Sequence, residues 1–506
     1  MRQARDPGAY VLLFFLCFFV LLSSGRIASS DAGHQLQASV MLAVTGHLGD
    51  DGRSGGPAND AWVRAPNGRM YQAHDIGNVA LMFPAAWIGS RLSPASPSQD
   101  MQNPPALSRV AVSLTGALVA TLGCYWLYRL FALYYDTRAA FLLSLAFPTT
   151  TIFIAYARAA WDVLPAAALV CGVLYYSAAL LRGVSPERSA VMIALTFGAA
   201  CSFRFSLAPF IAPAVFGVVA ARRRVLMPRA IVISAVVLAV VMLPSLAYNT
   251  IRTGSPLRPA TATVQYLQSN NALTGSIPHG LVGLFVSPNR GLFTYSPVLL
   301  FAFALPFLWK RLPADQRILL ICYGGGTFAY TLLIAKMVNW GAFGWGPRYL
   351  LPVLPVVFFA AATAIQYLFH PLKPLVIVTI AISSVLSVPP AIVNWHLATT
   401  TFDGAADPNA DRPYQQLAGW RALAWGIAGK PLPVSADAAE DRLRATTGVF
   451  PDLLLARVSA YSRTGFLITV LVLVGGVATA WRCVSVILGP TAVERTAAVP
   501  PAGQYR

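Results

Sequence analysis

The sequence predicts an all-α polytopic membrane protein with about twelve transmembrane helices. Of its 506 residues, 56% are hydrophobic and only 11% are charged, and the mean hydropathy is +0.60. A soluble domain carries about 25% charged residues on its surface, so much of this protein must face lipid instead of water. The hydrophobic residues also gather in runs close to the roughly 20 residues that a helix needs to cross a bilayer.

Twelve hydrophobic segments are the predicted spans, and the two shortest are 189–203 and 206–220. In chain order the spans are 10–28, 110–130, 139–157, 162–181, 189–203, 206–220, 229–248, 293–309, 317–335, 349–368, 374–393 and 464–482. Segment 74–92 is also hydrophobic, but counting it as a span would reverse the orientation of everything that follows. We therefore expect it to be an interfacial or re-entrant helix.

Basic residues predict how these spans are oriented. If the N-terminus is cytoplasmic, the short connections that carry Lys and Arg all fall on the cytoplasmic side, as the positive-inside rule expects. These connections are 129–138, 182–188, 222–229, 310–317 and 370–373. The longer segments 29–109, 249–292 and 394–463 then lie outside, which indicates that the protein works at its outer face.

The same pattern divides the chain into four parts. A transmembrane domain covers 1–395 and includes the long first outer loop, 29–109, with its interfacial helices. An extracytoplasmic loop region at 396–463 and a last transmembrane helix at 464–482 follow. The tail, 483–506, is predicted to be cytoplasmic and disordered. The sequence "IASSD" resembles a signal-peptide cleavage site, but the orientation requires the first helix to be retained, which favours an anchor.

Several classes of protein and site are not supported by the sequence. The net charge is +18, yet Lys and Arg lie in short clusters between hydrophobic runs, so we expect no binding to nucleic acid. The six cysteines all lie in hydrophobic stretches without a C-x-x-C motif. No nucleotide-binding or zinc motif is present, and we therefore expect neither a metal ion nor a cofactor.

A second set of charges lies at the outer ends of the predicted spans, where orientation does not explain them. These residues are Asp31, Asp75, Arg158, Asp162, Arg204, Arg290 and Arg348. A charge near the bilayer costs several kcal/mol unless it is paired or faces water, so the set predicts one cavity at the outer face. Arginine binds phosphate in a bidentate manner, and a carboxylate can act as a general base. A simpler alternative for one pair is that Arg158 and Asp162, four residues apart, neutralise each other.

Short motifs containing these residues occur along the chain. The first outer loop holds "DAGHQLQASVMLAVTGHL", beginning at Asp31, and "YQAHDIGNVALMFP" follows, beginning at Tyr71. Next come "YARAAWDVLPAAAL", "FRFS", "YNTIRTGSP", "SPNRGLFTYSPVLL" and "WGPRYLLPVLP". In this order they resemble motifs of the GT-C superfamily of membrane glycosyltransferases. The most similar branch is the bacterial one related to protein O-mannosyltransferases and to the enzyme that adds aminoarabinose to lipid A. Many relatives have Asp-Glu in the first loop, whereas Ala32 follows Asp31 here.

The resemblance, which covers about residues 10 to 395, implies a GT-C-like fold and a reaction. A sugar would move from a polyprenyl-phosphate donor to an acceptor hydroxyl, with inversion, in a bacterial inner membrane and on its periplasmic side. Asp31 would be the general base, and Asp162 would orient an arginine or a sugar hydroxyl. The substrate-binding residues would be Tyr71, His74, Asp75, Arg158, Arg204, Arg290 and Arg348. The partners would be the donor, membrane lipids and an acceptor that is a glycan, a lipid or a protein.

Two other functions remain open at this point. A transporter or flippase would have charged or broken helices near the bilayer midplane and short loops on both sides. A non-catalytic scaffold of the same fold would have lost its chemistry, and the single carboxylate in the first loop is compatible with that. The sequence selects neither the sugar nor the acceptor.

Overall fold

The structure is a computed structural model that describes the following residues: 7–27, 29–51, 62–92, 104–158, 160–262, 273–342, 344–396, 398, 415–430 and 450–489. Residues 490–506 of the predicted tail and more than half of the loop region at 396–463 lie outside these residues, whereas residues 483–488, predicted to belong to a disordered tail, form the end of a helix. The longer helices of the first half are α1 (Gly8–Leu22), α2 (Ser30–Thr45), α3 (Ile76–Leu92), α5 (Ala106–Phe131), α6 (Thr137–Thr150), α8 (Val163–Leu181), α9 (Pro186–Phe203), α10 (Ala208–Ala221) and α11 (Pro228–Thr253). The second half contains α13 (Ile277–Val286), α16 (Ala314–Lys336), α17 (Leu354–Leu368), α18 (Lys373–Leu386), α21 (Gln415–Ile427), α22 (Leu454–Tyr461) and α23 (Arg463–Leu488).

Shorter elements complete the described chain. The short α-helices are α7 (Phe153–Ala157), α14 (Leu292–Tyr295), α15 (Leu305–Leu308) and α19 (Val388–Ile392). The 3-10 helices are η1 (Phe205–Leu207), η2 (Ala260–Ala262), η4 (Pro297–Ala304), η5 (Trp309–Arg311) and η6 (Arg348–Val353). Strands β1 (Trp62–Arg64) and β2 (Met70–Gln72) form an antiparallel hairpin in which Trp62 pairs with Gln72.

Each of the twelve predicted spans is occupied by one helix or by consecutive helical segments. Six of the described helices are long and apolar enough to cross a membrane: Ala106–Phe131, Val163–Leu181, Pro228–Thr253, Ala314–Lys336, Arg348–Leu368 and Arg463–Leu488. Four apolar helices of 10–17 residues accompany them: Gly8–Leu22, Phe205–Ala221, Ile277–Val286 and Lys373–Leu386. The protein is thus a multi-pass membrane protein, while the count of twelve is not confirmed.

Several predicted spans are interrupted, and proline accounts for the breaks. The predicted span 374–393 divides into α18 and α19, which meet at Ser387 just before Pro389 and Pro390. The predicted span 293–309 begins with the short helix α14 and continues from Pro297 as a 3-10 helix. Proline lacks the backbone N–H and clashes with the preceding turn, so these segments are apolar enough to be predicted as spans without forming one regular helix.

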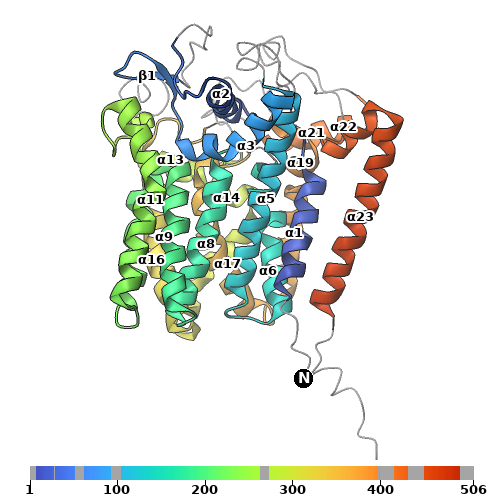
Figure 1. Ribbon diagram of the computed structural model, residues 1–506. Helices are drawn as coiled ribbons and strands as arrows, with labels where there is room; N and C mark the ends of the chain where they lie inside the picture. The colour runs from blue at the N-terminus through green and yellow to red at the C-terminus, as the bar shows by residue number, and fades with distance from the viewer. Residues whose placement is uncertain are drawn as a thin grey trace, which may run out of the picture.

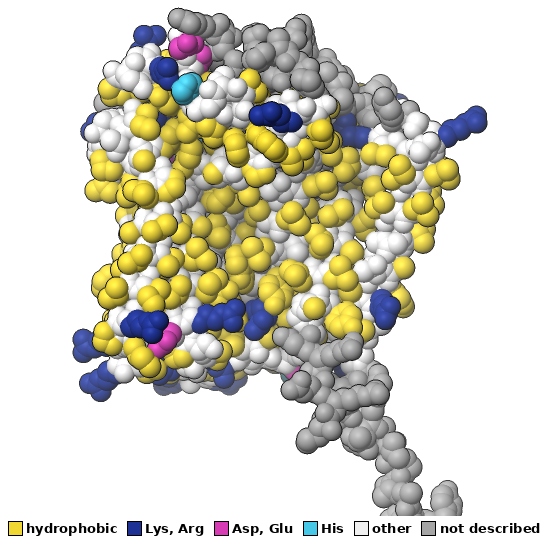
Figure 2. All heavy atoms as spheres, in the orientation of Figure 1, with side chains coloured by type: hydrophobic (Ala, Val, Ile, Leu, Met, Phe, Trp, Pro, Cys, Tyr) yellow, Lys and Arg dark blue, Asp and Glu magenta, His cyan; other side chains and the backbone are white. Residues whose placement is uncertain are grey.

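The helices form a bundle with different structures at its two ends (Figure 1). Helices α2 and α3 and the hairpin lie across one end, which we call the α2–α3 end, and the N-terminus lies at the opposite end. Figure 2 shows a broad hydrophobic band on one face, with Lys and Arg side chains near both ends of it. This distribution fits a bundle surrounded by lipid, with charged residues at the two water boundaries.

Burial within the bundle separates central from peripheral helices. Helix α8 packs between α5 and α9 and is almost entirely buried. Helix α11 instead exposes a stripe of large aliphatic side chains, Val232, Val236, Val240 and Leu243, each more than half exposed. Their spacing of three to four residues places them on one face of the helix. We therefore interpret this stripe as a lipid-facing surface.

Candidate active site

Asp31 lies in the first turn of α2, because the sequence before it begins a helix there. Ser29 caps α2 by accepting a hydrogen bond from the backbone N–H of Ala32 at 3.2 Å. A carboxylate in the first turn is also favoured by the helix dipole. The side chain of Asp31 accepts a hydrogen bond from Arg348, with 2.9 Å between Oδ2 and Nη1. Two residues that are 317 positions apart in the chain are thus in direct contact.

Arg348 is positioned by the motif "WGPRYLLPVLP". Gly346 adopts a left-handed backbone conformation with φ of +67°, and a Cβ there would lie 3.0 Å from the side chain of Ile152. Glycine is therefore the residue that this turn needs. The guanidinium of Arg348 lies 4.5 Å from the ring centroid of Trp161 and 5.2 Å from that of Tyr349. These aromatic faces hold the cation beside Asp31.

A second ion pair lies next to the first. The Nε of Arg204 is 3.4 Å from Oδ2 of Asp162, and the Arg204 guanidinium lies 5.3 Å from the Tyr349 ring centroid. His74 lies between the two carboxylates, with Nε2 3.9 Å from Asp31 and Nδ1 3.9 Å from Asp162. Two carboxylates, two guanidiniums and one imidazole therefore form a single cluster at the α2–α3 end.

A cavity of about 220 Å³ lies against this cluster. It is lined by His74, Asp75, Asp162, Arg204, Ser206, Pro259, Thr261, Leu273, Leu333, Ile334, Met337, Arg348 and Tyr349. The lining thus combines charged with aliphatic side chains, which suits a ligand with an anionic head and an apolar chain. Small-molecule sites usually enclose about 300–1,000 Å³. This cavity is smaller than that range, so it has room for the head of such a ligand but not for the whole ligand. Asp31 is not itself a lining residue and adjoins the cavity through its contact with Arg348.

The cluster determines the protonation state of Asp31. Burial raises the pKa of Asp31. The nearby cationic groups, Arg348 first and then His74, His34 and Arg204, lower it by more than burial raises it, so the net pKa is about 2. Asp31 is therefore ionised at any physiological pH. While Arg348 remains paired with it, Asp31 is also a weak base.

Asp75, at the same cavity, has a different environment. Its Oδ2 accepts a hydrogen bond from the backbone N–H of Phe205 at 2.8 Å, and its Oδ1 lies 3.7 Å from Arg252. Burial raises the pKa of Asp75 despite these partners. The two contacts join the turn before α3 to the start of η1, so Asp75 holds the cavity wall together.

Arg252 is a residue that the sequence analysis did not select, although it lies in the motif "YNTIRTGSP". One guanidinium nitrogen donates hydrogen bonds to the backbone carbonyls of Gln72, Ala73 and His74 at 3.0, 2.8 and 2.7 Å. The group also lies 4.0 Å from the ring centroid of Tyr248. Arg252 therefore fixes the turn that carries His74 and Asp75.

Tyr71 supports this turn from outside the cavity. Its ring lies edge-on to Tyr248 at 6.2 Å, and its hydroxyl accepts a hydrogen bond from Asn67 at 2.9 Å. Tyr71 is not among the residues that line the cavity. The structure therefore shows Tyr71 supporting the turn, and its role in substrate binding stays a prediction.

Replacing Arg252 with Lys is expected to loosen this turn. Lysine keeps the charge, but its compact ammonium group cannot reproduce the planar set of donors. Hydrogen bonds to charged groups contribute about 1.5–3 kcal/mol each, so we expect a loss of at least about 2 kcal/mol in the free energy of unfolding. Thermal unfolding in detergent measures this, with Arg258→Lys, a change at an exposed arginine in the segment that follows α11, as the control. An equal effect of the two substitutions would contradict the assigned role.

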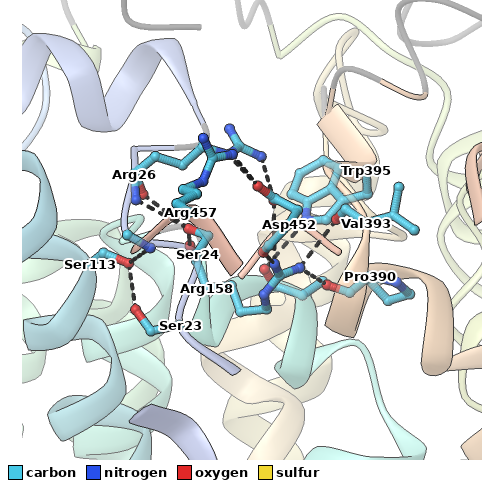
Figure 3. A network of polar contacts seen from close by, with 12 residues as sticks. Ser23, Ser24, Arg26, Ser113, Arg158, Pro390, Val393, Trp395, Asp452 and Arg457 are labelled. Carbon is cyan, nitrogen blue, oxygen red and sulfur yellow. Dashed lines mark hydrogen bonds and ion pairs between the residues drawn. The ribbon is translucent and has the colours of Figure 1, made fainter. Parts of the chain in front are cut away.

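Arg158 is not part of the cavity (Figure 3). Its Nε donates to the carbonyl of Leu22 at 2.8 Å, and its Nη1 donates to those of Pro390 and Val393 at 2.7 and 3.2 Å. Its Nη2 donates to the backbone carbonyl of Asp452 and lies 3.3 Å from the carboxylate of that residue. The carboxylate that Arg158 contacts is thus that of Asp452, whereas Asp162 pairs with Arg204. The nitrogens of Arg158 join three other chain segments to its own, and its role in substrate binding stays a prediction.

Asp452 is the centre of this second network (Figure 3). Arg26 binds its carboxylate in a bidentate manner, at 2.9 and 2.8 Å, and Arg457 donates to it at 2.6 Å. The carboxylate is buried, and these arginines together with Arg158 hold its pKa well below the usual range despite that burial. The network joins the segment after α1 to the segment before α22.

Arg290 lies behind the loop that carries Arg348. It is almost completely buried, and its Nη1 donates to the carbonyl of Gly344 at 2.6 Å. Arg290 does not line the cavity. Its hydrogen bond to Gly344 supports the segment 344–348, and its role in substrate binding stays a prediction.

The cluster offers no evident metal site. Within the described residues, no group of three or more His, Cys, Asp or Glu side chains is arranged to hold a metal ion.

Comparisons with known proteins give a distant structural likeness. No protein-family model matches the sequence, and no curated protein matches it. The structure is similar to that of ArnT from Cupriavidus metallidurans bound to undecaprenyl phosphate, with 16% identity and a TM-score of 0.47, over 97% of this chain and 77% of that one. The apo state of the same ArnT has the same identity and TM-score, over 94% of this chain and 77% of that one. ArnT is an aminoarabinose transferase of the GT-C superfamily, the group that the motifs resemble. Because these TM-scores are below 0.5, the proposal that follows rests on the side chains of the cavity.

Proposed function

We propose that the protein is a GT-C-type membrane glycosyltransferase that moves a sugar from a polyprenyl-phosphate donor to an acceptor hydroxyl. The observation that carries this proposal is the 2.9 Å contact between Asp31 and Arg348, an arginine that lines a cavity with both charged and aliphatic lining residues. A candidate base and a candidate phosphate-binding cation are thus close enough to act on one sugar phosphate.

The donor phosphate would bind to Arg348 and Arg204. Both guanidiniums line the cavity and lie against the ring of Tyr349 between them. Arginine matches phosphate oxygens with two parallel hydrogen bonds. The polyprenyl chain would lie along the aliphatic lining residues Leu333, Ile334 and Met337. A lipid donor therefore accounts for both the charged and the aliphatic lining residues, whereas a soluble nucleotide sugar accounts only for the charged ones.

Transfer then requires one base and one leaving group. Asp31 takes the proton from the acceptor hydroxyl as its oxygen attacks the anomeric carbon of the sugar. The bond between that carbon and the phosphate oxygen breaks, and its electron pair leaves with the polyprenyl phosphate. Arg348 and Arg204 stabilise the charge that develops on this phosphate. Attack from the face opposite the leaving group inverts the anomeric configuration.

Donor binding would also turn Asp31 into a stronger base. In the free protein Arg348 is the largest of the influences that lower the pKa of Asp31. A phosphate that binds Arg348 neutralises part of that charge, so the burial of Asp31 then raises its pKa. The base would thus become effective only after the donor has bound, which protects the cavity from acting on an incomplete set of substrates.

Asp162 and His74 would position the candidate base and the phosphate-binding arginines. Asp162 pairs with Arg204, and His74 lies between Asp162 and Asp31. Asp162 therefore orients a phosphate-binding cation, and His74 keeps the two ion pairs apart. With the N-terminus cytoplasmic, the α2–α3 end would face the periplasm of a bacterial inner membrane, where a lipid-linked donor is available without nucleotide.

A transfer experiment in reconstituted vesicles tests the proposal. Wild-type protein and the Asp31→Asn variant are given polyprenyl-phosphate sugar labelled in the sugar, together with a membrane extract that supplies acceptors. We expect label in acceptor with wild type alone. If the label crosses the bilayer while still attached to the donor, the protein is a flippase. If the label neither crosses the bilayer nor reaches an acceptor with either protein, the protein is a scaffold.

The pH dependence of the reaction gives a second test. The folded pKa of Asp31 is about 2, below the unfolded value of about 3.9, so its ion pair stabilises the fold above the unfolded pKa and loses that effect as the pH falls toward 2. For wild type, ionisation of Asp31 should leave kcat/KM level between about pH 8 and pH 4. Arg348→Gln removes the largest lowering influence, so we expect a lower kcat/KM with an acid limb shifted to higher pH. An unshifted acid limb would contradict the pairing.

A further inference from the structure

A second cavity, of about 240 Å³, lies between α5, α8 and α9. Its lining includes Tyr125 and Arg129 from α5, Tyr175 and Tyr176 from α8, and Ser185 and Arg188 around the turn into α9. No Asp or Glu is among the described residues that line it. Nothing in the proposed reaction uses this cavity.

The length of α8 places the two cavities at opposite ends of the bundle. Asp162, in the first cavity, precedes α8, and Ser185, in the second, follows the end of that helix. Helix α8 has 19 residues, which corresponds to a rise of about 28 Å. The hydrocarbon core of a bilayer is about 30 Å thick, so the second cavity lies at the opposite water boundary.

Two arginines and several tyrosine hydroxyls give this cavity the chemistry of an anion site. Arg129 donates to the hydroxyl of Tyr125 at 3.1 Å, and its guanidinium lies 5.9 and 5.4 Å from the ring centroids of Tyr125 and Tyr175. The cation is thus held at the wall of the cavity. Arg188, on the other side, is exposed. Two guanidiniums without a lining carboxylate favour a phosphate group.

A hydrophobic stripe on α5 leads into the cavity. Leu118, Leu122, Tyr125 and Arg129 are spaced by three or four residues and so share one face of the helix. Leu118 and Leu122 are exposed, at 55% and 39%. An acyl chain could lie along these leucines while its headgroup reached Arg129. A free phosphate ion would explain the arginines but not the exposed leucines beside them.

We propose that this cavity binds the phosphate headgroup of an anionic phospholipid at the end of the bundle opposite the active site. Basic pockets between transmembrane helices are known to hold such headgroups. The lining tyrosines, Tyr125, Tyr175 and Tyr176, are typical of the membrane interface, where lipid headgroups lie. The volume of the cavity suits a phosphoglycerol group, while the acyl chains remain in the bilayer along α5.

Native mass spectrometry of the full-length protein in neutral detergent tests this. Wild type, the double variant Arg129→Gln/Arg188→Gln and the control Arg223→Gln/Arg224→Gln are titrated with phosphatidylglycerol or with phosphatidylcholine. We expect wild type and the control to retain one phosphatidylglycerol that the cavity variant binds about tenfold more weakly. Equal retention by the cavity variant, or equal retention of the zwitterionic lipid by wild type, would overturn the proposal.

A second measurement needs only the wild-type protein, in case the cavity variant does not fold. Phosphatidylglycerol with a photoreactive group in its glycerol headgroup is cross-linked, and the labelled peptide is identified. We expect label between residues 184 and 189 or between 125 and 129, removed by excess phosphatidylglycerol but not by inorganic phosphate. Label elsewhere would overturn the proposal. Displacement by inorganic phosphate alone would show a free-anion site instead.

Discussion

Replacing Asp31 with Asn is expected to abolish sugar transfer while donor binding is retained. A general base contributes about 10²–10⁴-fold to a rate, and the amide cannot accept the acceptor's proton. The substitution also frees Arg348 from its 2.9 Å contact with Asp31, so the donor phosphate no longer competes with a carboxylate for that cation. We therefore expect an unchanged or lower Kd for polyprenyl phosphate, together with a single-turnover rate at least about a hundredfold below wild type.

The matched control for this substitution is Asp51→Asn. Asp51 is exposed in the same first loop, so its loss removes the same charge from the same face without touching the cavity. Transfer by this control should equal that of wild type. If Asp31→Asn transferred sugar at the control's rate, another residue would have to be the base, and the role of the ion pair in the mechanism would be wrong.

Replacing Asp452 with Asn is expected to have the largest effect on stability. Removing one partner from a buried ion pair costs about 3–5 kcal/mol, because the remaining charge is left uncompensated. Here three guanidiniums, those of Arg26, Arg158 and Arg457, share one carboxylate. The free energy of unfolding, measured by thermal or denaturant unfolding in detergent, should fall by about this amount.

The control for Asp452 is Asp315→Asn. Asp315 lies 3.9 Å from Arg182, whose side chain is 40% exposed, and exposed pairs contribute about 0–1 kcal/mol. The pH dependence gives a further check, because the folded pKa of Asp452 is depressed by its arginines. The stability it contributes is present above the unfolded pKa and is lost as the pH falls below it. A similar loss in the free energy of unfolding for both variants would show that the Asp452 network does not contribute unusually to the stability of the fold.

The charged cluster beside the cavity was predictable because its residues share a depth in the membrane. Asp31, Asp162, Arg204 and Arg348 each lie at the end of a predicted span, and a charge at such a position needs a partner or water. Because the bundle brings these span ends together, residues from four separate segments meet. The seven charges were not all equivalent, however, since Arg158 and Arg290 contact loops at the same end of the bundle, whereas Asp31 does not line the cavity but contacts the lining residue Arg348.

The carboxylate partner of Arg158 could not be predicted, because it lies in a segment without a hydrophobic period. Asp452 is 294 positions further along the chain, in a polar stretch where a sequence pattern does not fix the fold. Arg252 was missed for a different reason. Its signal was present in the motif that contains it, but its contacts are to backbone carbonyls of the turn 72–74, and backbone acceptors carry no side-chain signature.

The count of spans was limited by the same local chemistry. Mean hydropathy identifies apolar segments but does not respond to the hydrogen bond that each proline removes. The segment 293–309 is hydrophobic throughout, yet it folds as consecutive short helical elements from α14 to η5. Such a segment still fits inside a bundle, because neighbouring helices supply the missing contacts.

An experimental structure of the protein with polyprenyl phosphate bound tests the central claim most directly. The account predicts phosphate oxygens within hydrogen-bond distance of Arg348 and Arg204, with Arg348 drawn away from Asp31 and the prenyl chain along Leu333, Ile334 and Met337. A phosphate bound elsewhere on the bundle, with the Asp31–Arg348 contact unchanged, would contradict it.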